Sequence, residues 1–157
     1  METAKYSADQ IANWFLAYNR QFEASFDGEL LSNMKLQKLL YYAQGSFLAL
    51  EGYPLFRDKI EAWMHGPVVP SVYHRFSSIG SNGIDISENG VEIPDLSDGE
   101  TEILERDFEV FGRYSAWELR NMTHDETPWK ETASGDVIDL SLIKDYFEQH
   151  YLEEACS

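Results

Sequence analysis

The sequence has very little cysteine: the only one among its 157 residues is Cys156, next to the C-terminus. A single thiol cannot close a disulfide within the chain or build a cysteine-based zinc site. The sequence also lacks the run of roughly 20 apolar residues that a membrane helix needs. Its first residues, METAKYSADQ, lack the basic start and apolar stretch of a signal peptide. These absences predict a cytoplasmic protein that does not enter membranes.

The motifs that mark common catalytic and metal sites are missing as well. There is no glycine-rich phosphate loop and no His-Glu-x-x-His pair, and the histidines follow no standard ligand spacing. Ser115 lacks the Gly-x-Ser-x-Gly surroundings of a hydrolase nucleophile and is explained as a helix cap. We therefore predict no catalytic residue, no metal site and no cofactor. The alternative is an enzyme that uses His65, His74 or His124 as a general base.

Basic residues are scarce, with 12 Lys and Arg against 28 Asp and Glu and a net charge of −16. Residues 81–157 hold 20 of the acidic and five of the basic residues. This charge repels phosphate backbones, so we expect no nucleic-acid binding by this chain alone. It would attract a basic partner protein, and Glu102, Glu105 and Glu109, near one face of a predicted helix, are candidate contacts. The alternative is that the charge only maintains solubility.

The sequence does contain enough apolar material for a core, with 43% hydrophobic and 14% aromatic residues. We predict a single domain over residues 1–157, mainly α, as a compact bundle of about six helices with one small β-hairpin. Three helices begin with a capping box, in which Ser is followed by Gln or Glu three residues later. Helices are predicted to start at Ser7, Ser32, Pro67, Ser97, Ser115 and Ser141. The helix from Ser32 to about Glu51 is apolar over a wide arc and should be central.

The hairpin is predicted near residues 84–94. Ile84 and Ile86 precede the dipeptide Asn89-Gly90, and Val91 and Ile93 follow it. Asn-Gly suits a two-residue type I′ turn, because both residues tolerate positive φ. Residues 53–66, by contrast, are interpreted as an irregular or short extended link, and residues 124–138 as a loop.

Two segments are more specific than generic helical sequence. The first is KLQKLLYYAQG at residues 35–45, continued by PLF at 54–56 and EAWMHGPVVPSVY at 61–73; the second is SAWELRNMTHDETPW at 115–129. Through these motifs, in this order, the chain closely resembles the SocA-like antitoxins, the family that shares the Panacea domain and includes phage-associated proteins. The resemblance extends from about residue 11 to residue 147.

The resemblance implies an antitoxin of a bacterial toxin-antitoxin system that neutralises a cognate protein toxin by direct protein–protein contact. In the SocA-type member the antitoxin is also an adaptor that delivers the toxin to the protease ClpXP, so proteolytic delivery is the alternative. Many members carry additional DNA-binding segments. The acidic charge of this chain argues against such a segment here.

The same motifs supply candidate toxin-binding residues. The bulky or polar-tipped ones are Trp63, His65, Tyr73, His124 and Trp129, and tryptophan and tyrosine are frequent interface anchors. Leucines 36, 39 and 40 are predicted to be core, and Gly66 and Pro67 to set backbone geometry. Two interpretations stay open: the motif builds the binding surface, or it is a folding scaffold and the contact surface varies elsewhere.

Overall fold

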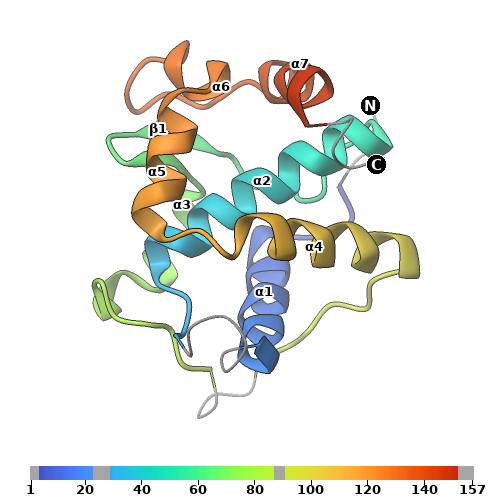
Figure 1. Ribbon diagram of the computed structural model, residues 1–157, viewed down its shortest axis with the longest axis vertical. Helices are drawn as coiled ribbons and strands as arrows, with labels where there is room; N and C mark the ends of the chain where they lie inside the picture. The colour runs from blue at the N-terminus through green and yellow to red at the C-terminus, as the bar shows by residue number, and fades with distance from the viewer. Residues whose placement is uncertain (1–3, 23–28, 87–90, 152–157) are drawn as a thin grey trace.

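A computed structural model describes residues 4–22, 29–86 and 91–151 of the chain (Figure 1). These residues form seven α-helices, one short 3-10 helix and a two-stranded antiparallel sheet, which confirms a mainly α fold with one small hairpin. In chain order the elements are α1 (Ala8–Phe22), α2 (Asn33–Glu51), β1 (Glu61–Trp63), β2 (Gly66–Val68), α3 (Pro70–Arg75), η1 (Ser77–Ile79), α4 (Asp98–Phe111), α5 (Ala116–His124), α6 (Thr127–Lys130) and α7 (Leu140–His150).

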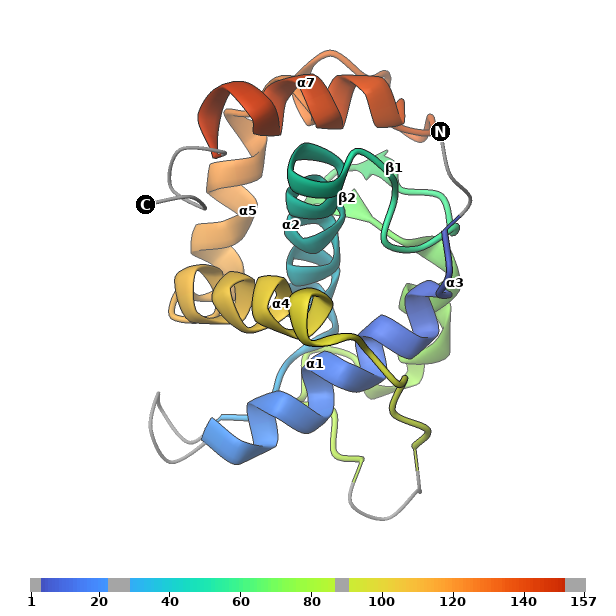
Figure 2. The same ribbon diagram turned by 90° about the vertical axis from the view of Figure 1, so that its right-hand side faces the viewer.

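Helix α2 is the central element, as its wide apolar arc predicts. Helices α1, α4, α5 and α7 and strand β2 all pack against it (Figures 1 and 2). Its residues from Leu36 to Leu48 are all buried, so the polar side chains within that stretch are enclosed along with the apolar ones. Gly45 lets α7 approach closely, because a Cβ at this position would overlap the Phe147 ring.

The predicted helix starts at Ser7, Ser32, Ser97 and Ser115 are confirmed. At Ser7, Ser97 and Ser115 the hydroxyl accepts from the backbone N–H three residues on, and the Gln or Glu there accepts from the serine N–H. Ser32 caps α2 by accepting from the backbone N–H of Lys35 at 3.2 Å. These contacts satisfy backbone donors that the first turn of a helix leaves free.

The hairpin is not where the sequence predicts it. Its strands are β1 and β2, joined by Met64 and His65. Strand β1 and the turn lie in residues 53–66, interpreted as an irregular or short extended link, and β2 runs from Gly66 into the segment predicted to begin a helix. Asn89-Gly90 lies outside the described residues, and the described residues on either side, 84–86 and 91–94, form no strand. The N–H of Ile84 instead donates to the carbonyl of Leu31 at 2.8 Å. A turn signal is local, and here a distant backbone partner takes the hydrogen bond.

Pro67 lies in β2 and does not begin a helix, which corrects a second prediction. It faces Ala62 across the hairpin, and the N–H and C=O of Ala62 point the other way, toward Asp136 and Gly135. Pro67 therefore occupies a non-hydrogen-bonded position, where its missing N–H costs nothing. Pro70 takes the first position of α3 instead.

The C-terminal region differs in two details from the prediction. The predicted loop 124–138 contains the four-residue helix α6, with Pro128 in its first turn. Helix α7 is capped by Asp139, whose carboxylate accepts from the N–H of Ser141 at 2.9 Å, whereas Ser141 was the predicted cap. The N–H of Ile138 is bonded to the carbonyl of Ile60, so the chain is held extended up to the residue before Asp139.

Candidate protein-binding surface

The hairpin lies directly on α2 and α5, and Gly66 makes this approach possible. Gly66 has φ +112°, a region that residues with a side chain rarely adopt. A Cβ there would meet the Lys38 Cε of α2 and the Thr123 Oγ1 of α5, both at 2.8 Å. The motif glycine therefore sets backbone geometry, and its lack of a side chain allows the hairpin to pack closely against two helices.

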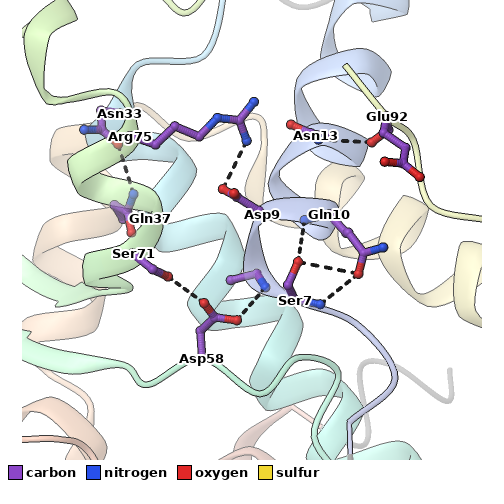
Figure 3. A network of polar contacts seen from close by, with 11 residues as sticks. Ser7, Asp9, Gln10, Asn13, Asn33, Gln37, Asp58, Ser71, Arg75 and Glu92 are labelled. Atoms are coloured by element: carbon purple, nitrogen blue, oxygen red, sulfur yellow. Dashed lines mark hydrogen bonds and ion pairs between the residues drawn. The ribbon is translucent and has the colours of Figure 1, made fainter. Parts of the chain in front are cut away.

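Polar side chains of α2 hold the hairpin and the start of α3. The Gln37 Oε1 accepts from the backbone N–H of Val69 at 2.8 Å, and its Nε2 donates to the Asn33 Oδ1 at 2.9 Å. The Asn33 Nδ2 in turn donates to the carbonyl of Tyr73 at 3.0 Å. Figure 3 shows Asn33 and Gln37 on one side of this helix. This part of the motif is scaffold, because its side chains are used to place backbone.

A second polar network fastens α1 to α3 (Figure 3). Asp58 accepts from the backbone N–H of Ala8 at 2.8 Å and from the Ser71 hydroxyl at 2.6 Å. Arg75 pairs with Asp9 at 3.1 Å. The hairpin and α3 are therefore held from both sides, by α2 and by α1.

The structure brings together all five aromatic and histidine candidates of the motif. Trp63 and Tyr73 meet edge to face with ring centroids 5.0 Å apart, and His124 stacks on Trp129 at 3.8 Å. The Trp129 indole Nε1 donates to the carbonyl of Trp63 at 2.8 Å, which joins the two pairs. His65, in the turn of the hairpin, is exposed, and the other four are half-buried.

Three further residues at this place were missed by sequence reasoning. Met64 and Trp117 are among the most exposed large hydrophobic residues described, at 72% and 57%. The Arg120 guanidinium lies over the Trp117 ring at 4.4 Å, and its Nε donates to the His65 Nδ1 at 3.2 Å. The contact between Trp117 and Arg120 could have been predicted from the sequence, because residues three apart on one helix lie on the same face. We call Trp63, Met64, His65, Tyr73, Trp117 and Arg120 the hairpin surface.

Two basic side chains, Lys38 and Arg120, lie at the hairpin of this acidic protein. No ion pair among the described residues includes Lys38, beneath the hairpin, or Arg120. Burial, followed by the charge of Arg120, lowers the pKa of Lys38 to about 7. Burial, followed by the charge of Arg120, also lowers the pKa of His124. Lys38 and Arg120 thus lie here without an ion-pair partner among the carboxylates that the structure describes.

The three glutamate candidates lie elsewhere. Glu102 and Glu109 are exposed on α4 and Glu105 is half-buried, and α4 and the hairpin lie on different sides of α2 (Figure 2). Tyr18 of α1 is close to this row: burial first, then the charges of Glu105 and Glu109, raise its pKa. The sequence candidates therefore separate into two surfaces, one at the hairpin and one on α4.

Neither surface resembles a metal centre or a membrane anchor. In the described parts of the chain, no group of three or more His, Cys, Asp or Glu side chains is placed to hold a metal ion. Within the same residues, no helix combines the length and apolar character that crossing a bilayer requires. What the hairpin surface offers is aromatic, methionine and arginine side chains on a fixed backbone, which is the composition of protein interfaces.

Comparison with known proteins finds matches to more than half of the chain. A family model described as antitoxin SocA-like, Panacea domain, matches residues 36–130, which include most of α2, the hairpin, α5 and α6. The antitoxin SocA of Caulobacter vibrioides is 36% identical over 126 residues, which covers 71% of this chain. The chain spans 65% of the length of that relative. No solved structure matches. The chain therefore belongs to the family of SocA-like antitoxins that share the Panacea domain.

Proposed function

We propose that this protein is an antitoxin that neutralises a protein toxin by direct binding, with the hairpin surface as the contact. Family membership and the name of the relative in Caulobacter vibrioides support the antitoxin role. The observation that carries the contact surface is the exposure of Met64, in the turn of the hairpin, and of Trp117, whose ring lies under Arg120. Tryptophan and arginine dominate interface hot spots, and methionine adapts to irregular partner surfaces.

The rigidity of this surface favours binding by occlusion. Gly66 is fixed between Lys38 and Thr123, and the Val69 N–H is held by Gln37. Less conformational entropy is lost on binding when the contact groups are already ordered. A toxin that docks here would be covered without any rearrangement of the core.

The test combines two substitutions on the surface with a matched control. The double variant Met64→Ser, Trp117→Ser removes both exposed apolar side chains, and Ile93→Ser removes another exposed one, at 44%, outside the surface. We expect the double variant to bind the toxin at least about 100-fold more weakly, as for loss of two hot spots, and to lose protection of toxin-expressing cells. Ile93→Ser should keep both. Wild-type affinity in a folded double variant would rule out this surface.

Proteolytic delivery is separated from occlusion by following the toxin after binding. If the antitoxin acts by occlusion, the toxin persists in a stable complex and its lifetime does not depend on ClpXP. A toxin that disappears only in cells with ClpXP would identify the chain as an adaptor. Both outcomes require the same contact, so the double variant is defective in either case.

A further inference from the structure

A pocket of about 280 Å³ lies beneath the hairpin, between α2, the strands and α3. Met34 of α2, Trp63 and Val68 of the strands and Tyr73 of α3 give it a largely apolar wall. Exposed Met64 lines it too and belongs to the hairpin surface. The pocket is therefore continuous with the proposed toxin contact.

The polar wall of the pocket offers free hydrogen-bond donors. Asn33 and Gln37 both line it. The bond from the Val69 N–H fixes the Gln37 oxygen, and the bonds from Gln37 to Asn33 and from Asn33 to Tyr73 fix the orientation of both amides. Each amide nitrogen carries two hydrogens and uses one in these bonds. Both side chains therefore retain a donor.

Lys38 and His65 add further donors to the same pocket. Lys38 is only 1% exposed, and of its three N–H groups one donates, to the carbonyl of Pro67 at 3.2 Å. The His65 Nδ1 accepts from Arg120, so a neutral His65 carries its proton on Nε2, which is a donor. No described carboxylate forms an ion pair with Lys38. A buried ammonium without a counter-charge is costly, and an incoming anion would offset that cost.

The ligand that suits this pocket joins an apolar group to a carboxylate. The apolar group would pack against the wall formed by Trp63, Val68 and Tyr73. The carboxylate accepts several hydrogen bonds at once, which matches the surplus of donors, and its charge matches Lys38. A neutral apolar group would leave Lys38 uncompensated, and a cation would be repelled by it.

We propose that this pocket captures the C-terminal residue of the toxin, with its side chain against the aromatic wall and its terminal carboxylate toward Lys38. The proposal rests on the proposed function and names the part of the toxin that is recognised. A volume of about 280 Å³ is at the lower limit of ligand pockets. One terminal residue carries both required groups on a single Cα, whereas an internal acidic residue would need a neighbour to supply the apolar part.

A pair of small probes tests the pocket independently of the toxin. N-acetylphenylalanine presents a side chain and a free carboxylate as a C-terminal residue does. Its amide has nearly the same size but no charge, and an NH2 donor replaces one acceptor oxygen. We expect the acid to shift the Trp63 indole resonance in NMR titrations with millimolar affinity, and the amide to bind at least tenfold more weakly. Lys38→Met should remove this preference, while Lys130→Met, an exposed lysine on α6, should keep it. Equal binding of acid and amide, or an unchanged preference in a folded Lys38→Met protein, would overturn the pocket assignment.

A second experiment uses the toxin itself. Toxin with an amidated C-terminus should bind wild-type protein at least tenfold more weakly than unmodified toxin, and should bind Lys38→Met no differently. If the acid probe binds but amidation of the toxin has no effect, the pocket binds carboxylates but does not bind the C-terminus of the toxin. If binding is lost in the Met64→Ser, Trp117→Ser variant while neither probe binds, the pocket proposal fails and the proposed function stands.

Discussion

Glu126 accepts hydrogen bonds from three tyrosine hydroxyls, Tyr41 and Tyr42 at 2.8 Å and Tyr151 at 2.7 Å. Burial raises the pKa of this carboxyl, and the three hydroxyls counteract the rise. The contacts join α2 to the start of α6 and to the residue that follows α7. Sequence reasoning did not single out Glu126, because nothing in its neighbourhood along the chain shows that three distant hydroxyls converge on it.

Asp107 is a second buried carboxyl, and it has fewer hydrogen-bond partners than Glu126. Its Oδ1 accepts from the Ser46 hydroxyl at 2.7 Å, while its buried Oδ2 has no hydrogen-bond partner. Burial raises its pKa to about 8. Between about pH 4 and pH 8 the folded protein therefore holds this proton more tightly than the unfolded chain does. The free energy of unfolding falls as the pH rises through that window.

The substitution Asp107→Asn should raise the free energy of unfolding at pH 8 by about 1–3 kcal/mol, because the amide resembles the protonated carboxyl and carries no charge to bury. The gain should shrink toward pH 4, where the native carboxyl is protonated as well. Urea unfolding of both proteins at the two pH values measures the difference. An equal gain at both would mean that the buried charge of Asp107 is not its cause.

At the scale of elements, α2 acts through its buried polar side chains, each of which holds a different segment. The Gln44 Oε1 accepts from the N–H groups of Leu55 and Phe56, and its Nε2 donates to the carbonyl of Phe56. Gln37 does the same for the junction of β2 and α3 through Val69. A fully buried helix can position its surroundings in this way because the bonds are shielded from water.

Gln37→Met should lower the free energy of unfolding by about 1–3 kcal/mol, since the buried N–H of Val69 loses its acceptor. Hydrogen exchange at Val69 should accelerate more than exchange in α7. The matched control is Gln149→Met on the exposed surface of α7, which should change stability by less than about 0.5 kcal/mol. Unchanged protection of Val69 would show that Gln37 does not hold the hairpin.

Gly45→Ala tests the close approach of α7 to α2. A methyl group at Gly45 would overlap the fully buried Phe147 ring, so we expect a loss of about 1–3 kcal/mol from overpacking, larger than the gain in helix propensity. Gly99→Ala is the control, because nothing lies within 4 Å of a Cβ there; it should be neutral or stabilising. Thermal unfolding of both variants compares them. A stabilised Gly45→Ala protein would show that α7 can move away without cost.

For the molecule as a whole, the charge and the proposed contact surface do not coincide. The net charge of −16 comes mostly from residues 81–157, while the hairpin surface includes Arg120 and lies over the buried Lys38. A basic toxin would be attracted over long distances by the acidic side, including the row on α4, and would then dock through short-range contacts.

The association rate should therefore fall about tenfold or more between low and physiological salt. Changing Glu102, Glu105 and Glu109 together to lysine should slow association more than it speeds dissociation, and the corresponding glutamines should have a smaller effect. Stopped-flow rates against the toxin at several salt concentrations measure both. A flat salt profile would mean that the acidic half serves only solubility.

Several features of this protein follow from the sequence by itself. The starts of α1, α2, α4 and α5 depend on a serine and the backbone or side chain three residues later, so the information lies within one helical turn. The central position of α2 follows from its own apolar arc. The family follows from motifs that can be read in order along the chain, and the same motifs contain Trp63, His65, Tyr73, His124 and Trp129.

The tertiary structure alone decided where the hairpin lies and what the motif builds. Asn89-Gly90 predicts a turn from two residues, but the N–H of Ile84 bonds to Leu31, more than 50 residues earlier in the chain. The bond from Trp129 to Trp63 spans 66 residues, and the contact of Arg120 with His65 spans 55. Bonds within one turn form with little loss of chain entropy, so local sequence specifies them. Pairings across such distances form only once the core has brought their partners together, and the partners available there depend on the whole fold.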